Sequence, residues 1–583
     1  MKYLSLLLFF IVLLTSCTTS KTKEEVKIEN TPVTVEEMIK EVDSISMPTR
    51  GERKEFDFVK ANNEIVSFTS TIDNKQFLVS VSSPDNKYTL YNQDDLPESY
   101  SFIDKEITES QKNEDNISYN YIVRDQNLES LTIESDVPYM ITFSNTTINA
   151  TTTPALILKG AGKCFINLEG DVSLSDSIDN KKKGAITADC DVIITGDGCL
   201  TLTANKKHGL KIDGELRILS GVITIITSKT AEGNAISVDT YYIQDGGDIA
   251  IFATNDTHNQ ENKGIKVNGT EDRESGKLVI NGGRLYIESV DKGLTAGWKI
   301  DEDATTESTA DDPDPSLYIN NGIISIITTG EIYEISDEES LSPEGIEAKN
   351  NLVINGGLIQ LSTSDDSLNA GSSIEINGGY IFCQSRDADA IDSNGVIKIT
   401  GGTTIALGSN APEMGIDCDE SKNFTYQGGT IIAISGANNN APSSTDTTGY
   451  VIREKLEGSS FALLDESGKV LIAYSVPNGH ESKDALMIAS DDIKLDSVYY
   501  YISDAAINGK NLFNGLISNA KVLGEKKEIL ILDHINGESQ EMGFGKMMIP
   551  EGFDPSTMTP PDGFDPSKMT PPKGFDKKFR ELK

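Results

Sequence analysis

Two clusters of carboxylates lie about one repeat apart in the stretch TSDDSLNAGSSIEINGGYIFCQSRDADAIDSNGVIKITGG, residues 363–402. The acidic residues and the amide that could act together are Glu347, Asp365, Asp366, Asn369, Asp387, Asp389, Asp392, Asp417 and Asp419. Carboxylates that lie close together repel one another, and a bound cation relieves that repulsion. Because Ca²⁺ takes roughly six to eight oxygen ligands, the pattern predicts calcium ligation if the fold stacks the clusters. An acidic turn exposed to solvent is the alternative.

The elements that must position these residues form an internal repeat. Copies of the pattern small-Ile-x-Ala, turn, alternating run, Gly-Gly, alternating run start at Gly345, Ser367, Ala390 and Gly415, which are 22, 23 and 25 residues apart. Apolar residues that alternate by two indicate strands rather than helices. The leucine and asparagine ladder typical of a leucine-rich repeat of similar length is absent. The sequence therefore predicts an all-β, right-handed parallel β-helix with three short strands in each coil and β-rich caps at both ends.

Successive coils of such a fold stack equivalent residues in columns, and neighbouring residues of one column lie roughly 4.8 Å apart. Just after the Ile of the first strand, this alignment stacks Glu347, Asn369, Asp392 and Asp417. No EF-hand loop is present, so the expected calcium site is built from several coils. At the same corner of earlier coils the chain has other residues instead: Lys183, His208, Lys263 and Lys292. These cations either bind substrate carboxylates or pair with acids of the protein itself.

The composition and the termini bound the partners and the domains. A formal net charge of -40 argues against nucleic acid, whose phosphates would be repelled. Residues 3–14 are apolar and have the length of a signal-peptide core. The expected organisation is a signal peptide at 1–17, a tether at 18–55, an N-terminal β-rich cap at 56–150, a parallel β-helix at 151–448, a C-terminal β-rich cap at 449–535 and a Pro-rich repetitive tail at 536–583.

Two parts of the sequence resemble known families. The segment Leu-Thr-Ser-Cys ending at Cys17 resembles the lipobox of bacterial lipoproteins, which implies a diacylglycerol on Cys17 and an outer-membrane or cell-surface location. The segments EGIEAKNNLVINGG, SDDSLNA…SIEINGG and DADAIDSNGVIKITGG resemble a bacterial carbohydrate-binding family with a calcium-containing, pectate-lyase-like parallel β-helix. That resemblance covers about residues 135–510, and members of the family bind cellulose and polygalacturonate.

The resemblance implies a polysaccharide partner, bound calcium and, within the acidic set, Asp366, Asn369, Asp389, Asp392 and Asp417 as the main ligands. The glycines of the family's Asp-Gly-Ile motif are replaced here by Ser367 and Ala390. Stacking on sugar rings would use aromatic side chains. The candidate carbohydrate-binding residues are Arg284, Tyr286, Trp298, Tyr380 and Phe382. For each aromatic residue, packing against a neighbouring loop is the alternative.

Three functions remain open from the sequence. The favoured one is a non-catalytic, monomeric, calcium-dependent binder of an acidic polysaccharide such as polygalacturonate. A calcium-dependent polysaccharide lyase on the same scaffold would need a base beside the metal, for which Arg386 is the candidate. A structural or adhesive surface protein would use calcium only to stiffen the coils.

Overall fold

The computed structural model describes residues 119–254, 262–270, 275–298, 314–334, 340–419, 423–442, 450–494 and 497–531, together with strands at 78–82, 87–91 and 103–106. Within these residues the chain is all β and contains no α-helix, and therefore no helix that could cross a membrane. The expected signal peptide, the tether, Cys17 and the Pro-rich tail lie outside the described residues.

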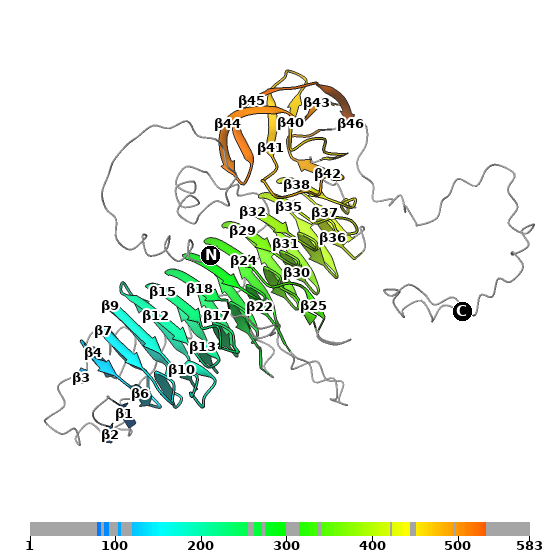
Figure 1. Ribbon diagram of the computed structural model, residues 1–583. Coiled ribbons are helices and arrows are strands. Elements are labelled where there is room, and N and C mark those ends of the chain that lie inside the picture. The colour runs from blue at the N-terminus through cyan, green and yellow to red at the C-terminus, as the bar shows by residue number, and fades with distance from the viewer. Residues whose placement is uncertain are drawn as a thin grey trace, which may run out of the picture. The chain divides into compact units, whose positions relative to one another are not determined.

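Each coil contributes three strands to three ladders that run along the stack (Figure 1). Sheet I contains, in spatial order, β2 (Lys87–Tyr91), β1 (Leu78–Ser82), β6 (Ser130–Glu134), β8 (Leu156–Lys159), β10 (Gly184–Ala188), β13 (His208–Ile212), β16 (Ile236–Val238), β19 (Ile265–Val267), β22 (Leu294–Ala296), β27 (Ile346–Ala348), β30 (Leu368–Ala370), β33 (Ile391–Ser393) and β36 (Ile416–Cys418). Apart from the antiparallel pairs of β1, the strands of sheet I are parallel.

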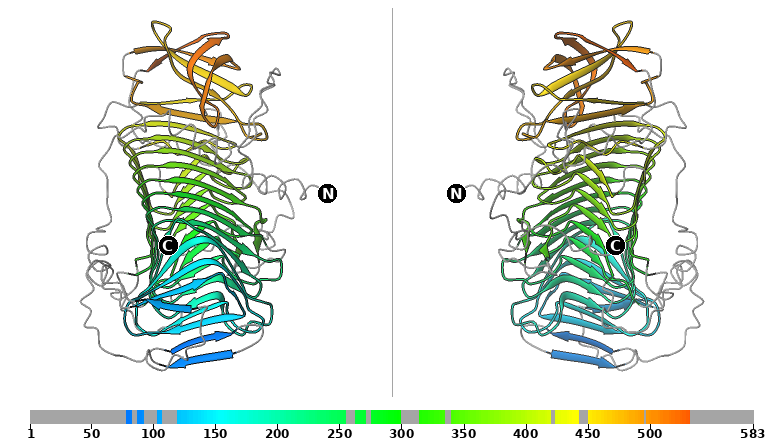
Figure 2. Two further views of the ribbon diagram at one scale, coloured as in Figure 1. Left: turned by 90° about the vertical axis from the view of Figure 1, so that its left-hand side faces the viewer. Right: turned by 90° about the vertical axis from the view of Figure 1, so that its right-hand side faces the viewer.

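Sheets II and III complete the coils. Sheet II contains β11 (Val192–Gly196), β14 (Leu216–Ile218), β17 (Tyr241–Gln244), β20 (Lys277–Ile280), β23 (Leu317–Ile319), β28 (Asn351–Ile354), β31 (Ser373–Ile376), β34 (Val396–Ile399) and β37 (Phe424–Tyr426). Sheet III contains β12 (Cys199–Ala204), β15 (Val222–Thr227), β18 (Asp248–Ala253), β21 (Arg284–Ser289), β24 (Ile323–Thr328), β29 (Leu358–Thr363), β32 (Tyr380–Ser385), β35 (Thr403–Leu407) and β38 (Thr430–Ser435). The prediction of a parallel β-helix with three strands in each coil is confirmed, and the coils stack along one axis in both side views (Figure 2).

The two ends of the stack differ from its middle. At the N-terminal end, β3 (Ile103–Glu106), β4 (Tyr119–Arg124), β5 (Asn127–Leu128), β7 (Tyr139–Asn149) and β9 (Cys164–Ser175) join the ladders, and the long strand β9 pairs with both β11 and β12. Parallel pairing thus already includes β4, β6 and β7, which precede residue 151. At the C-terminal end, β42 (Ala485–Ser490) runs antiparallel to β38 and to β39 (Tyr450–Glu454), so parallel growth of sheet III ends there.

Apolar side chains of the three sheets meet inside each coil. In the coil of β27, β28 and β29, the inward residues are Ile346, Ala348, Leu352, Ile354, Ile359 and Leu361, and all are fully buried. The same alternation recurs in the neighbouring coils, and the inward residues form one continuous core. Burial of each large aliphatic side chain contributes roughly 1.5–3 kcal/mol relative to exposure, so the repeated pattern stabilises the stack coil by coil.

The recurring Asn-Gly-Gly motif marks the corner between sheets II and III. The second glycine adopts a positive φ, for example 93° at Gly379, where a Cβ would lie only 2.7 Å from the carbonyl oxygen of Gly357. The asparagines form an amide ladder, in which Asn320 donates to Asn281 at 2.8 Å, Asn355 to Asn320 at 2.7 Å and Asn377 to Asn355 at 3.0 Å. These bonds satisfy polar groups that the corner would otherwise bury unpaired.

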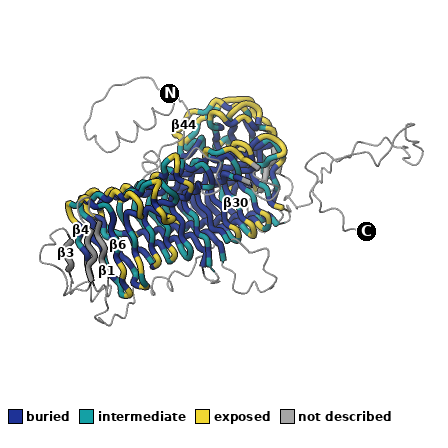
Figure 3. The backbone as a smooth tube through the Cα atoms, turned by 60° about the horizontal axis from the view of Figure 1, so that its bottom comes forward, coloured by how far each residue is buried: buried dark blue, intermediate teal, exposed yellow. Residues whose placement is uncertain are grey.

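A second structure, the C-terminal sheet, covers part of the stack. It contains β44 (Ala506–Phe513), β45 (Leu516–Leu523), β41 (Val470–Ser475), β40 (Ser460–Asp465), β43 (Ser497–Ser503) and β46 (Lys527–Ile531), and a two-stranded hairpin of β25 (Tyr333–Glu334) and β26 (Ser340–Leu341) lies between β24 and β27. The apolar residues of the C-terminal sheet join a cluster with outward side chains of β29, β32, β35 and β38. The residues of β30 are buried or half-buried, whereas most residues of β44 are exposed (Figure 3).

Candidate functional site

The outer side of sheet I presents one column of side chains in strict register. From β10 to β36 the register partners in this column are Thr187, Lys211, Ser237, Lys266, Thr295, Glu347, Asn369, Asp392 and Asp417. The column is neutral or cationic in the first coils and acidic or amide-bearing from Glu347 onward. The stacking of Glu347, Asn369, Asp392 and Asp417 that the repeat predicts is therefore confirmed.

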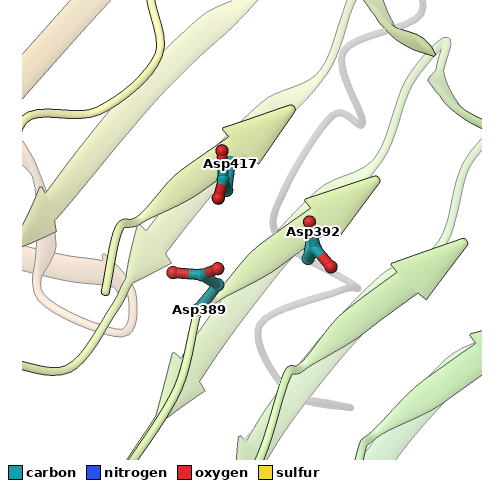
Figure 4. A group of neighbouring side chains, drawn as sticks. All are labelled: Asp389, Asp392 and Asp417. Atoms are coloured by element: carbon teal, nitrogen blue, oxygen red, sulfur yellow. The ribbon is translucent and has the colours of Figure 1, made fainter. Parts of the chain in front are cut away.

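Three carboxylates converge at the C-terminal end of this column (Figure 4). Asp392 and Asp417 are register partners on β33 and β36, and Asp389 lies two residues before β33. One oxygen from each of the three lies within 4.8 Å of the others. An ion with Ca–O distances of roughly 2.4 Å contacts oxygens up to about 4.8 Å apart, so the spacing fits calcium. We call these three residues the aspartate triad.

Neighbouring groups hold the triad in place. The backbone N–H of Met414 donates to Oδ1 of Asp389, and Nδ2 of Asn440 donates to Oδ1 of Asp417 at 2.6 Å. In the coil before, Oδ1 of Asp366 accepts the backbone N–H of Asp389 at 3.1 Å. Within the described residues, no lysine or arginine forms an ion pair with any member of the triad. The negative charge of the triad is thus oriented but not neutralised by side chains of this part of the chain.

The environment of these carboxyl groups favours their protonated form. Burial raises the pKa of Asp389 to about 7, with the nearby Asp417 adding to the effect. Burial and Asp417 likewise raise the pKa of Asp392 to about 6. The pKa of Asp366 also lies well above its usual range because of burial and the proximity of Glu344. A divalent cation would replace the bound protons and remove the repulsion.

In the coil that contains Glu344 and Glu347, lysines neutralise the carboxylates. Nζ of Lys292, whose side chain is 12% exposed, lies 2.7 Å from Glu344 and 3.3 Å from Glu347, and Lys349 also pairs with Glu347. Although burial alone would raise it, the two lysines hold the pKa of Glu347 at about 2. Glu347, a candidate metal ligand, is therefore already balanced by two cations. Asn369 donates to Glu344 and to Asp366, both at 3.2 Å, and bridges this network to the acidic coils.

The remaining acidic candidates lie outside the triad, although Asp365 and Asp419 are near enough to contribute to the raised pKa of Asp392. Asp387 pairs with Arg386 at 2.6 Å, and both side chains are about half exposed. Asp419 is exposed, and the half-buried Asp365 has a pKa that burial raises. Of the candidate ligands, the structure brings Asp389, Asp392 and Asp417 within reach of one ion. Arg386, the candidate base of a lyase, has a carboxylate of its own as a partner.

The cationic corner of the earlier coils serves the protein's own acids. Lys263 forms a buried pair with Asp291, as Lys292 does with Glu344. Nδ1 of the buried His208 accepts the backbone N–H of Asn234 at 3.0 Å, and burial lowers the pKa of His208 to about 3. These contacts agree with pairing inside the protein, the second of the two roles that the sequence leaves open for these residues.

The candidate carbohydrate-binding residues divide into covered and accessible ones. Tyr380 and Phe382 are only 8% and 3% exposed, and their rings lie 5.7 and 6.4 Å from that of Phe513 in the C-terminal sheet. The expectation that these two rings stack on sugar is therefore corrected, because an element outside the repeat covers them. Trp298 is half-buried, and the residues that follow it lie outside the described part of the chain.

Arg284 and Tyr286 remain partly exposed on the outer side of β21. Arg284 pairs with Asp248 of the neighbouring coil, and the ring of Tyr286 lies 5.8 Å from that of Phe252. Sequence reasoning missed Phe252. Its outward place in the alternating run DIAIFA was the signal that could have identified it.

A family model described as "Carbohydrate-binding domain-containing protein" matches residues 126–390. No curated protein and no solved structure matches the chain. The matched range includes Asp389, ends just before Asp392 and does not reach the next coil, to which Asp417 belongs. Over this range the chain is similar to a family of carbohydrate-binding domains.

Proposed function

We propose that the protein binds an acidic polysaccharide, such as polygalacturonate, with calcium held by the aspartate triad. Carbohydrate binding is supported by the family match over residues 126–390. The observation that carries the calcium proposal is the convergence of three carboxylates whose charge no described lysine or arginine neutralises. Their oxygens, their spacing and the absence of sulfur or imidazole among them suit a hard cation better than zinc.

The charge of the protein favours such a bridge. With a formal net charge of -40, the chain repels an anionic polysaccharide. Bound calcium supplies positive charge and further coordination positions that sugar carboxylates can fill. Asp389, Asp392 and Asp417 hold the ion, while Met414 and Asn440 orient two of these carboxylates. Asn369, which belongs to the same column and donates to Glu344 of the neighbouring coil, supplies an amide beside the triad.

Affinity electrophoresis tests this proposal directly. We expect polygalacturonate in a native gel to retard the full chain in calcium but not in chelator, without release of unsaturated or reducing sugars. Asp392→Asn and Asp417→Asn should each abolish the retardation. Asp465→Asn, at the end of β40 in the C-terminal sheet and outside the helical stack, is the matched control and should behave as wild type in the gel. Equal retardation in chelator, or in the triad variants, would refute calcium-dependent binding, and release of unsaturated products would indicate a lyase.

We further propose that Cys17 carries a lipid anchor that holds the protein at a bacterial membrane surface, as its resemblance to a lipobox implies. Radiolabelled palmitate should be incorporated into the wild-type protein in bacterial cells but not into Cys17→Ala. Labelling of the variant to the wild-type level would exclude this cysteine as the site.

A further inference from the structure

Two consecutive corners between sheets III and I carry a group of lysines, which we call the lysine cluster. Its members precede β10 and β13 and are Lys181, Lys182, Lys183, Lys206 and Lys207. Gly184 and His208 are register partners, and the backbone N–H of His208 donates to the carbonyl of Lys183 at 2.9 Å. The two runs of lysines therefore lie side by side on neighbouring coils.

Most of the lysine cluster is open to solvent and has no carboxylate partner of its own. Residues 181–183 are exposed and Lys206 is half-buried. These four lysines form no ion pair with the described residues, whereas Lys263 of a later coil pairs with the buried Asp291. Asp179 is the exposed carboxylate of these two corners. The cluster is thus a positive surface on a chain whose formal net charge is -40.

An apolar side chain is held at the surface beside the lysine cluster. The backbone N–H of Asn180 donates to the carbonyl of Ser177 at 3.0 Å and closes a turn whose second residue, Ile178, is 53% exposed. The buried Asp176 fixes this turn from inside, because it accepts Nδ2 of Asn180 at 2.7 Å and the backbone N–H of Asn205 at 2.6 Å. The turn therefore presents Ile178 to solvent.

The same corner has the opposite charge near the other end of the stack. The segments before β30 and β33 carry carboxylates in place of the lysines, with Arg386 as a single cation among Asp365, Asp366, Asp387 and Asp389. An anionic surface that attracts the lysine cluster repels these acidic corners. Contact with such a surface is therefore expected at the N-terminal coils and not along the whole stack.

We propose that the lysine cluster and Ile178 form a docking face for an anionic lipid bilayer. Lysines gathered at one surface attract lipid phosphates, and an isoleucine beside them can enter the boundary between headgroups and acyl chains. An acidic polysaccharide would also attract the lysines, but it offers no apolar layer for Ile178.

This inference goes beyond the proposed function, because it does not require a lipid on Cys17. It assigns the face that the molecule turns toward a membrane. The order of strands in sheet I places β33 and β36, which carry Asp392 and Asp417, several coils away from β10 and β13. Docking by the lysine cluster therefore leaves the aspartate triad away from the bilayer, where a polysaccharide can reach it.

Sedimentation of the full chain with lipid vesicles tests this assignment. Vesicles of phosphatidylcholine are compared with vesicles that contain about one third phosphatidylglycerol, in chelator so that calcium cannot join carboxylates to lipid phosphates. The apolar residues 3–14 contribute to binding of both kinds, so the measured quantity is the ratio of the two affinities. We expect wild type to prefer the anionic vesicles by roughly a hundredfold at low salt and to lose this preference at high salt.

Two variants separate the contributions of charge and apolar contact. The triple variant Lys181→Gln, Lys182→Gln, Lys183→Gln should bind both kinds of vesicle alike, since each lysine near an anionic surface contributes about fivefold. Ile178→Ser should weaken binding to the anionic vesicles by about fivefold, because it removes the apolar contact and leaves the charge unchanged.

Matched controls come from the C-terminal end of the described chain. The triple variant Lys455→Gln, Lys469→Gln, Lys521→Gln removes three exposed lysines and thus the same charge. Leu523→Ser removes an apolar side chain that is 76% exposed. Both controls should bind as wild type, and urea unfolding should show that every variant is folded.

The outcomes decide between a bilayer and other partners. Equal affinity of wild type for both kinds of vesicle, or an unchanged preference in the triple variant at 181–183, would overturn the docking face. Equal losses in the two triple variants would show that net charge alone acts, which also overturns it. Retardation by polygalacturonate in chelator that disappears in the variant at 181–183 would identify a glycan site instead. Calcium-dependent retardation is tested separately by the triad variants and can succeed where the docking face fails.

Discussion

The two halves of sheet I differ in how the charged side chains on their outer side are balanced. From β10 to β22, lysines meet acids of the same or the neighbouring coil, as in the pairs Lys211–Asp239 at 2.7 Å and Lys263–Asp291. From β30 to β36, three carboxylates converge without a described cationic partner. The backbone and the inward residues hardly differ between the halves. The outward position of a β-helix can thus change from internal charge balance to cation binding without any change in the fold.

Lys292 stands at the boundary between these halves. It is the last lysine of the cationic corner, and its partners Glu344 and Glu347 belong to the first coil of the acidic half. Although burial alone would lower it, these two carboxylates and Asp291 raise the pKa of Lys292 above its ordinary value. The side chain is therefore charged and balances the start of the acidic half.

Removal of this lysine should produce the largest effect. Lys292→Met leaves two buried carboxylates without their shared cation, which is expected to lower the free energy of unfolding by about 3–5 kcal/mol. Urea unfolding would measure the loss. Lys455→Met provides the control, because Lys455 and Asp484 are both mostly exposed and their pair contributes at most about 1 kcal/mol. Equal losses in the two variants would contradict the distinct role of Lys292.

The raised pKa values of the triad predict an unusual pH dependence without metal. Because Asp389 and Asp392 titrate near 7 and 6 when folded but near 4 when unfolded, the folded state binds more protons between these values. In chelator the free energy of unfolding should therefore fall as the pH rises from 5 to 7.5, by on the order of 2 kcal/mol. Calcium should restore the stability at pH 7.5.

The two halves supply the variants for this test. The double variant Asp389→Asn, Asp392→Asn should flatten the decrease, and Asp239→Asn, in the cationic half, should leave it unchanged. Thermal unfolding at a series of pH values, with chelator and with calcium, would measure both. A stability that rises with pH in chelator would show that the triad is not the group whose ionisation costs stability.

The asparagine ladder should behave alike in both halves. Asn320 and Asn377 each make two hydrogen bonds along the same corner: Asn320 donates to Asn281 and accepts from Asn355, whereas Asn377 donates to Asn355 and accepts from the hydroxyl of Thr400. Replacing either by Ala leaves a neighbouring amide group without its bond, at a cost of about 1–3 kcal/mol. We expect similar losses for Asn320→Ala and Asn377→Ala by urea unfolding, with and without calcium. A loss at Asn377 that only calcium reveals would link the ladder to the triad.

Much of the fold could be predicted from the sequence because each repeat has the same pattern of alternating apolar residues and glycines. The alternation in LVINGGLIQL gives two strands and the glycines give the corner between them, as observed for β28 and β29. The same alignment placed Asn369, Asp392 and Asp417 in one column. Alignment of the repeats predicts the strand register, because every coil pairs with the next.

Contacts that join unlike parts of the chain could not be read in this way. Tyr380 and Phe382 occupy outward positions of the repeat, yet Phe513 covers them from a strand 131 residues beyond Phe382. The insertion between β22 and β27 likewise hid that Lys292 and Glu344 belong to adjacent coils. Among several candidate carboxylates, the convergence of three depends on where Asp389 turns before β33, which the pattern does not specify.

The smallest effect is expected at Arg386, where the comparison separates a surface pair from the buried network. Arg386 and Asp387 are about half exposed, so the pair contributes little, and Arg386→Gln should change the free energy of unfolding by less than about 1 kcal/mol. Calcium-dependent binding of polygalacturonate should also be unchanged in the gel assay, because the triad lacks contact with this side chain. A wild-type protein that released unsaturated sugars and lost this activity in Arg386→Gln would instead identify the arginine as a base, and the acidic half as the site of a lyase.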